Sequence, residues 1–149
     1  MDFNNFIGGS NDYAFTFQSG SSISVYIDGS GHLSGDSVNM AALAGPALVS
    51  LGQNIRNVES ITGNNTNSTL TGENNANNWT INGINDGIVD GVTFVDFNNL
   101  SGGTGDDTFL ITGTGIVTGN IDGGAQVTAD SVDYSNFAKL DITVAVGFY

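Results

Sequence analysis

The chain has 149 residues, enough for one domain of modest size, and a formal net charge of −13, because 15 acidic residues outnumber the two basic ones, Arg56 and Lys139. Two basic side chains cannot neutralise a phosphate backbone, so this composition excludes nucleic acid as a partner, and the acidic surface disfavours anionic membranes. The absence of Cys excludes disulfides and thiolate metal sites.

We expect neither membrane insertion nor a signal peptide within this chain. No apolar run reaches the ~18 residues of a membrane span. Met1 is followed by Asp2, without the basic segment that opens a signal peptide. A chain rich in Gly, Asn, Thr and Asp that lacks Cys is typical of bacterial secreted surface proteins. The sequence therefore predicts an extracellular or cell-surface location.

Short apolar runs with a period of two, separated by Gly, Asn and Asp, predict strands and turns along the whole chain. The 22 Gly and 19 Asn disfavour helix, and Pro46 interrupts the only stretch rich in Ala and Leu. Apolar residues two positions apart point to the same side of a strand. In chain order, the predicted core is Phe3, Phe15, Phe17, Ile23, Ile27, Val58, Ile61, Leu70, Trp79, Ile81, Phe94, Phe97, Leu100, Phe109, Ile111, Ile121, Val132, Tyr134 and Ile142.

An ungapped internal repeat runs through the chain at an offset of 94 residues. Residues 1–17 (MDFNNFIGGSNDYAFTF) align with residues 95–111 (VDFNNLSGGTGDDTFLI), and 15 of the 55 overlapping positions are identical. The sequence thus predicts one full unit over residues 1–94 and part of the next over residues 95–149. We expect a piece of a longer tandem array; the alternative is a natural short protein derived from one.

A finer period lies inside this unit. Signals of the form apolar-x-Gly recur at steps of 20, 19 and 21 residues, starting from Ile61, Ile81, Leu100 and Ile121. A period near 20 suits one coil of a β-solenoid, in which each coil stacks on the next. We therefore predict an all-β fold over residues 1–149: a right-handed parallel β-helix with coils of about 20 residues and no significant helix.

The most specific local motif is GGTGDDTFL at residues 102–110, which matches the calcium nonapeptide pattern GGxGxDxUx at every defined position. Glycine permits positive φ and a close approach of the backbone, so carbonyl oxygens can turn toward a cation beside a carboxylate. Oxygen ligands suit Ca²⁺, which takes about six to eight of them. The predicted Ca²⁺ ligands are Gly102, Gly103, Gly105 and Asp107, with Asp130 as an acidic residue in the following turn.

The other copies of this motif are degraded. Residues 63–71 (GNNTNSTLT) carry Ser68 where Asp is expected, and residues 72–80 (GENNANNWT) carry Asn77. A calcium site in such a roll is shared between successive turns, so one complete copy supplies only part of a site. The alternative is that these are tight turns in which Asn and Asp cap the backbone, with Asn side chains forming ladders along the stack.

Three runs resemble repeats of giant bacterial surface proteins: residues 74–87 (NNANNWTINGINDG), 92–111 (VTFVDFNNLSGGTGDDTFLI) and 119–135 (GNIDGGAQVTADSVDYS). They are similar to repeats of the filamentous-haemagglutinin-like and RTX-type adhesins. The resemblance covers residues 57–146, and it extends to residues 1–40 through the internal repeat. It implies a secreted or surface-anchored array that forms a stiff, calcium-associated stalk. The chain departs from the family at residues 123–130, where the second GGxGxD turn is stretched.

Little in the sequence suggests catalysis, although parallel β-helices often carry polysaccharide-degrading enzymes. His32 is the only His and lies in a turn rich in Gly and Ser. The neighbouring carboxylates Asp106 and Asp107 are expected to point to opposite faces, which disfavours a shared glycosidase site. We therefore predict no enzymatic activity, and we expect the aromatic side chains in the core rather than on a carbohydrate-binding face.

The sequence thus predicts a structural repeat of a secreted bacterial adhesin or surface filament, forming a stiff acidic stalk that Ca²⁺ stabilises. Its expected partners are further copies of the same repeat, in tandem or end to end. The alternative is a subunit that assembles end to end into a filament, and the remaining interpretation is a carbohydrate-binding or polysaccharide-degrading β-helix. The residues name no glycan or host-surface ligand.

Overall fold

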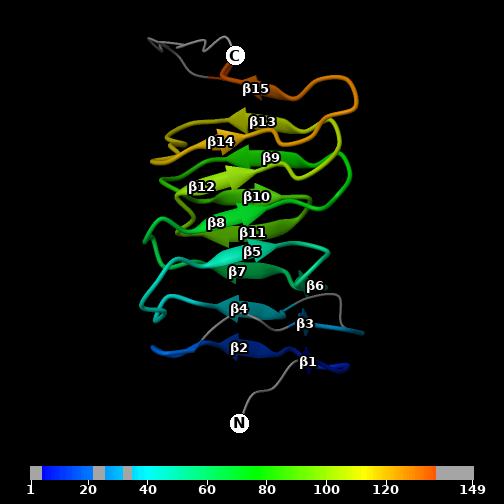
Figure 1. Ribbon diagram of the computed structural model, residues 1–149, viewed down its shortest axis with the longest axis vertical. Helices are drawn as coiled ribbons and strands as arrows, with labels where there is room; N and C mark the ends of the chain where they lie inside the picture. Colours follow the sequence, from blue (N-terminus) through cyan, green and yellow to red (C-terminus); the bar gives the residue numbers. More distant parts are fainter. Residues whose placement is uncertain (1–4, 22–25, 32–34, 137–149) are drawn as a thin grey trace.

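The computed structural model describes residues 5–21, 26–31 and 35–136, and these consist of strands joined by turns (Figure 1). The all-β prediction is confirmed for these residues, which contain no helix. Accordingly, no helix within these ranges is long and apolar enough to cross a membrane. Three residues of the predicted core, Phe3, Ile23 and Ile142, lie outside the described ranges, and so does His32.

The described strands form three sheets. The first has the order β1 (Asn5–Ile7), β3 (Tyr26–Asp28), β6 (Ile55–Arg56). The largest has the order β15 (Ser131–Asp133), β13 (Thr108–Ile111), β9 (Asn78–Ile81), β10 (Gly87–Val89), β11 (Val92–Val95), β7 (Ser60–Thr62), β4 (Ser37–Asn39), β2 (Ala14–Thr16). The third has the order β14 (Ile121–Asp122), β12 (Asn99–Ser101), β8 (Thr69–Thr71), β5 (Leu48–Ser50).

Most neighbouring strands are parallel, because the chain returns to the same side of the molecule after each pass. Phe6 of β1 pairs with Ile27 of β3, and Leu100 of β12 pairs with Ile121 of β14. The second pair of strands repeats the first at the 94-residue offset, in the same register. The same holds for β2 with β4 and β13 with β15, where Phe15 pairs with Val38 and Phe109 pairs with Val132.

One segment departs from the predicted parallel arrangement with a period near 20. Strand β10 runs antiparallel to both of its neighbours, β9 and β11. Asp90 and Gly91, with φ of 45° and 91°, form the two-residue turn between β10 and β11, as a tight hairpin requires. The pairs that span this insertion are separated by more than one predicted coil, since Thr69 pairs with Asn99 and Asn78 with Thr108.

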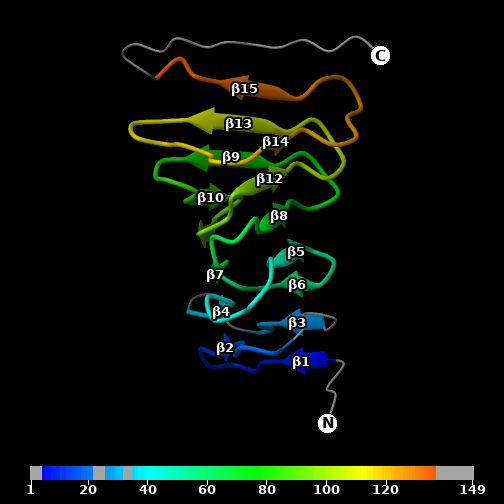
Figure 2. The same cartoon turned by 60° about the vertical axis from the view of Figure 1, so that its left-hand side comes forward.

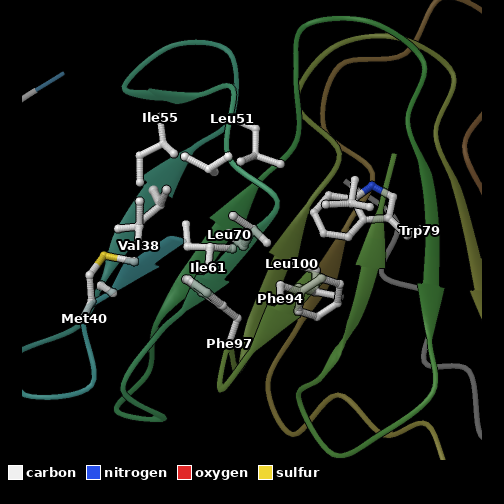
Figure 3. Close-up of a cluster of buried hydrophobic side chains, with 14 of the residues drawn as sticks. Val38, Met40, Leu51, Ile55, Ile61, Leu70, Trp79, Phe94, Phe97 and Leu100 are labelled. Atoms are coloured by element: carbon white, nitrogen blue, oxygen red, sulfur yellow. The ribbon is translucent and has the colours of Figure 1, made fainter. Parts of the chain in front are cut away.

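The first and third sheets together face the largest sheet. A parallel bridge between Leu51 and Ile55 joins β5 to β6 and so connects the two smaller sheets edge to edge. Figure 2 shows β1, β3, β6, β5 and β8 stacked on one side, with β2, β4, β7 and β13 stacked on the other. The apolar side chains of both sides meet between them, in a core that follows the long axis of the stack (Figure 3).

Most of the predicted core is confirmed. The predicted residues that are buried are Phe17, Ile27, Val58, Ile61, Leu70, Trp79, Ile81, Phe94, Phe97, Leu100, Phe109 and Ile111, while Phe15, Ile121 and Tyr134 are partly buried. Val132 was wrongly predicted, since 46% of it is exposed. The sequence prediction also missed buried residues of the stretch that contains Pro46, among them Met40, Val49, Leu51 and Ile55.

Aromatic rings fill the centre of the stack. The Trp79 ring stacks on Phe109 in the next parallel strand, with centroids 5.3 Å apart and an interplanar angle of 17°. Phe94 meets the same indole edge to face at 5.7 Å. Each of these side chains is at most 1% exposed. The three rings therefore fix the spacing between β13, β9 and β11 through packing as well as through backbone hydrogen bonds.

The repeat offers a matched test of this core, because Val38 and Val132 occupy equivalent positions in β4 and β15. Val38 is 1% exposed, whereas Val132 is 46% exposed. We expect Val38→Ala to lower the free energy of unfolding by about 2 kcal/mol, through lost burial and a cavity. Val132→Ala should change it by less than about 0.5 kcal/mol. Chemical denaturation followed by circular dichroism measures both, and equal effects would contradict the placement of β15 at an exposed end of the core.

Candidate functional site

The predicted calcium turn, residues 102–107, joins β12 to β13 at one side of the stack. Gly103 and Gly105 have φ of 94° and 122°, a region that side chains rarely tolerate. The turn then brings Asp107 to the position directly before β13. The glycines of the motif are therefore required by the backbone path of the turn itself.

Asp107 is fully buried and binds the pass of chain beneath it. Its Oδ1 accepts hydrogen bonds from the backbone N and the side-chain Nδ2 of Asn77, each at 2.7 Å. Asn77 holds the equivalent position directly before β9, which pairs with β13. This carboxylate thus caps the buried backbone N–H of Asn77, directly before the strand. Such capping by Asp is what the alternative interpretation, tight turns without a metal, predicted.

The same contact recurs along this side of the large sheet. The amide of Asp107 donates to Oδ1 of Asp130 at 2.9 Å, and the amide of Tyr13 donates to Oδ1 of Asp36 at 2.6 Å. The amide of Asp36 in turn donates to Oε2 of Glu59 at 2.7 Å. We call these stacked carboxylates the acceptor column: Asp36, Glu59, Asp107 and Asp130. Asp107 and Asp130 are thus brought into successive turns, as a shared site would require.

Two carboxylate oxygens of the acceptor column are buried without a hydrogen-bond partner: Oδ2 of Asp107 and Oδ2 of Asp36. The first occupies the space beside Gly102, where an added Cβ would collide with it and with the carbonyl oxygen of Gly123. An unpartnered carboxylate oxygen in a buried place is energetically costly. A positively charged partner would remove that cost at Asp107.

The remaining predicted ligands are partly engaged. The carbonyl of Gly102 accepts from Asn77 Nδ2, and the carbonyl of Gly103 accepts from the amide of Ala125, both at 3.0 Å. Each carbonyl retains a second lone pair. No group of three or more His, Cys, Asp or Glu side chains gathers around a common point in the described ranges. The described contacts thus show the capping role of the Asp107 carboxylate, through its hydrogen bonds from Asn77.

Asp106 is separated from Asp107 and lies at the surface, as the alternation of the chain predicted. Its Oδ1 accepts hydrogen bonds from three backbone amides, at 2.6 Å from Thr128, 2.9 Å from Val127 and 3.2 Å from Ala129. The hydrogen bond from the Thr128 amide is the main cause that lowers the pKa of this carboxyl below its ordinary value. Asp106 thus holds the stretched loop before Asp130 in place.

Asparagine side chains form the predicted ladder in the turn at residues 64–67. Nδ2 of Asn99 donates to Oδ1 of Asn67 at 3.1 Å, and Oδ1 of Asn99 accepts from the amide of Asn120 at 3.0 Å. Nδ2 of Asn85 and Nδ2 of Asn98 both donate to Oδ1 of Asn65, at 2.9 and 2.8 Å. In the other predicted turn, at residues 74–78, Asn77 points inward and caps backbone groups instead.

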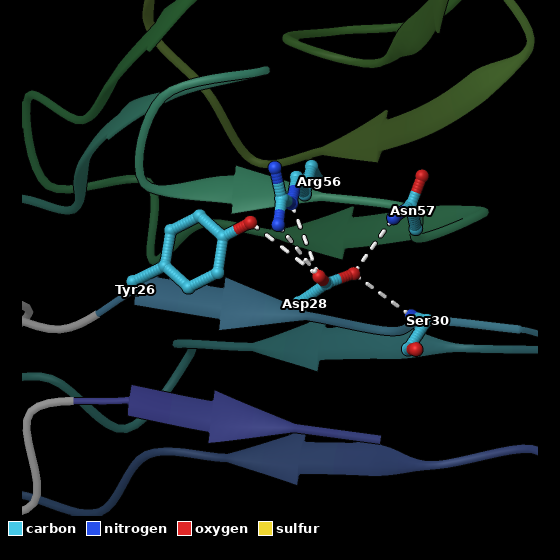
Figure 4. Close-up of polar contacts among 5 residues, drawn as sticks. All are labelled: Tyr26, Asp28, Ser30, Arg56 and Asn57. Carbon is cyan, nitrogen blue, oxygen red and sulfur yellow. Dashed lines mark hydrogen bonds and ion pairs between the residues drawn. The ribbon is translucent and has the colours of Figure 1, made fainter. Parts of the chain in front are cut away.

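The sequence did not reveal a polar cluster around Asp28, which is 8% exposed (Figure 4). Its Oδ2 accepts from Nε of Arg56 at 3.1 Å and forms an ion pair with a second guanidinium nitrogen at 3.0 Å. Its Oδ1 accepts from Asn57 Nδ2 at 2.7 Å and from the amide of Ser30 at 3.0 Å. The guanidinium also covers the ring of Tyr26, 4.5 Å from its centroid. The cluster clamps β3 to β6, and its carboxylate is fully occupied.

Comparison with known proteins yields no match to the chain among family models, curated proteins or solved structures.

The cluster around Asp28 predicts a loss of stability when the guanidinium of Arg56 is removed. Arg56→Gln leaves a largely buried carboxylate without its ion pair, and we expect the free energy of unfolding to fall by roughly 1 kcal/mol, because half of the Arg56 side chain is solvent-screened. Arg56→Lys should recover only part of this, since an ammonium cannot form the two-pronged contact. In the background of Asp28→Asn, Arg56→Gln should have a smaller effect in urea denaturation; an unchanged effect would contradict the pairing.

Proposed function

We propose that the chain is a right-handed β-solenoid repeat with a mechanical role, a stalk segment of a secreted bacterial adhesin or surface filament. One observation carries this proposal: strands separated by 94 residues pair with their neighbours in the same register, as in β2 with β4 and β13 with β15. Units that stack in one register can be added along one axis without changing the cross-section, which is the property of a rod.

The distribution of polar groups supports a structural rather than a catalytic role. The carboxylates of Asp28, Asp36 and Asp107 point inward and bind backbone or side-chain donors of neighbouring passes. The net charge of −13 would keep long arrays soluble outside the cell. The partners proposed for this chain are accordingly further copies of the same repeat, and we propose no enzymatic activity.

A tandem fusion tests the rod directly. The fusion consists of residues 1–94 followed directly by residues 1–149. Because residue 1 is equivalent to residue 95 in the internal repeat, the second part continues the chain in the same register. Because β2 and β13 are six positions apart in the large sheet, each added unit should lengthen the molecule by about 29 Å, at ~4.8 Å per strand. Small-angle X-ray scattering should show that increase in maximum dimension, with an unchanged cross-sectional radius. A fusion that widens instead would contradict the proposal.

We further propose that Ca²⁺ binds at the turn of residues 102–107 and stiffens the stack. The ion would be held by the free Oδ2 of Asp107 and by backbone carbonyls of Gly102, Gly103 and Gly105, with Asp130 in the following turn. The unpartnered Oδ2 of Asp107 supports this proposal. The millimolar Ca²⁺ concentrations found outside cells would occupy even a weak site of the extracellular type.

Calcium removal tests this second proposal. A ligand that binds only the folded chain raises its stability, by about 2.7 kcal/mol at 100 times its dissociation constant. We expect the melting temperature in millimolar Ca²⁺ to exceed that in EDTA by several degrees, measured by circular dichroism. Asp107→Asn keeps the Oδ1 acceptor for Asn77 but removes the charge, so it should fold and lose this response.

Asp36→Asn is the matched control for that experiment. Asp36 is also a buried member of the acceptor column with a free Oδ2, but it lies outside the turn of residues 102–107. This variant should therefore keep the response to Ca²⁺. Equal melting temperatures of the unmodified chain in Ca²⁺ and EDTA would leave the carboxylates as backbone caps alone, and the rod proposal would still stand on the scattering result.

The alternative function is a subunit that assembles end to end into a filament. One observation favours it: β1 and β2 are the outermost strands of their sheets in the described part of the chain. Strand edges of this kind are templates for pairing with another chain.

A further inference from the structure

Asn82 is the one asparagine of the chain that is followed by glycine. It lies directly after β9, in the loop that leads to β10, and it is exposed to solvent. Within the described residues, no group forms a hydrogen bond with its side-chain amide. The carbonyl carbon of this side chain, Cγ, is therefore open to attack by a neighbouring nucleophile.

The nearest nucleophile is the backbone nitrogen of the next residue, Gly83. Its N–H donates to the backbone carbonyl of Asp86 at 3.4 Å, and the N–H of Asn82 donates to the same oxygen at 3.3 Å. Backbone hydrogen bonds are shortest and strongest near about 2.9 Å, so the Gly83 nitrogen is only weakly engaged. Glycine also has no Cβ that would hinder the approach of its nitrogen to the Asn82 side chain.

The other backbone groups of this loop are held firmly by the following pass of the chain. The carbonyl of Gly83 accepts from the amide of Ile116 at 2.9 Å, and the amide of Asn85 donates to the carbonyl of Ile116 at 2.7 Å. These contacts belong to the parallel bridge between Ile84 and Ile116. A longer backbone at residues 82–83 would therefore strain this bridge.

We infer that Asn82 and Gly83 form a site of self-modification, in which Asn82 becomes an acidic residue and water is the only other reactant. The backbone nitrogen of Gly83 loses its proton and attacks Cγ of Asn82. A new C–N bond closes a five-membered succinimide ring, and the side-chain nitrogen leaves with that proton as ammonia. Water then opens the ring at either carbonyl and gives aspartate or isoaspartate. No atom is oxidised or reduced.

Both products change this part of the molecule. Each adds one negative charge to a chain whose net charge is −13. Isoaspartate also routes the backbone through the former side chain, which inserts one extra carbon between residues 82 and 83. We therefore expect the modified chain to be less stable, through the bridge between Ile84 and Ile116. The inference depends neither on the proposed stalk function nor on calcium.

Mass-spectrometric peptide mapping tests the inference on the folded 149-residue chain. The chain is kept for several weeks in EDTA at mildly alkaline pH, where more of the Gly83 nitrogen is deprotonated. We expect the peptide that contains Asn82 to gain one mass unit, as NH₂ is replaced by OH, and to separate into an aspartate and an isoaspartate form. A synthetic peptide of residues 78–87 gives the rate of the free segment, and the folded chain should react at a comparable rate.

Asn74 is the control within the same chain. It is also exposed, and its side chain has no hydrogen-bond partner among the described residues, but Asn75 follows it instead of glycine. Asn74 should therefore stay unmodified over the time in which Asn82 reacts. Equal modification of both residues would overturn the role of Gly83. An intact Asn82 in the folded chain, while the synthetic peptide reacts, would overturn the inference as a whole.

Asn82→Gln is the matched variant. It keeps the amide and the charge but lengthens the side chain by one CH₂, so that attack by Gly83 would have to close a larger, less favoured ring. The melting temperature of the unmodified sequence, measured by circular dichroism, should fall as the modified fraction rises. That of Asn82→Gln should stay constant over the same period. An equal fall in both would overturn the assigned effect on the bridge between Ile84 and Ile116.

Discussion

The close approach of successive passes of chain at the strand ends constrains the rest of this structure. A Cβ added at Gly29, Gly63 or Gly102 would collide with a backbone oxygen of the next pass, so only Gly fits at these positions. The space so kept free is not empty. At Gly29 and Gly102 it is taken by the carboxylates of Asp36 and Asp107, which turn back from the following strand into the corner. Glycine at the end of one strand and a short acidic side chain before the next are thus two parts of one packing requirement.

A second constraint is that two sheets sharing one core must have the same height. Strands are spaced almost equally in all sheets, so each side needs nearly the same number of them. The chain departs twice from strict alternation between the two sides. Strands β5 and β6 both lie on the side of the smaller sheets, linked through Leu51 and Ile55, and β10 and β11 are added on the opposite side. The bridged pair of smaller sheets then has seven described strands against eight in the large sheet. The two sides of the described chain therefore agree to within one strand, and Trp79, beside the antiparallel insertion, is buried in the core.

The fold class and most of the core could be predicted from the sequence, because alternating apolar residues and the 94-residue repeat report local structure and spacing directly. The antiparallel insertion could not be predicted from the 20-residue period, since it fits between two of the period's signals without displacing them. A signal was nevertheless present: Asp90 and Gly91 between alternating apolar residues are a strong hairpin sequence.

Val132 was misplaced because its equivalent, Val38, is covered by β7, whereas no strand of the described chain covers β15. Burial depends on neighbours in the stack, which the local pattern does not contain. The ion pair of Asp28 with Arg56 was missed for the same reason, since its partners come from different passes of the chain.

In the acceptor column, capping a backbone amide requires one side-chain oxygen and does not require a carboxylate. A single side-chain oxygen is enough to cap the amide of the pass below, and Ser68 does so for Ala47 with a neutral hydroxyl, at 3.0 Å. Asn77 holds the same place as Asp107 in the preceding pass of the large sheet and carries no charge. A carboxylate at Asp107 and Asp36 therefore exceeds the needs of capping, and its second oxygen is left buried and unpartnered in both cases. Where capping is the only role of a position, a neutral residue can accept the same hydrogen bond with a smaller desolvation penalty than a carboxylate. Asp36 and Asp107 share this feature, but only Asp107 belongs to a complete GGxGxD motif, so the two residues separate what the motif adds from what a buried carboxylate does by itself.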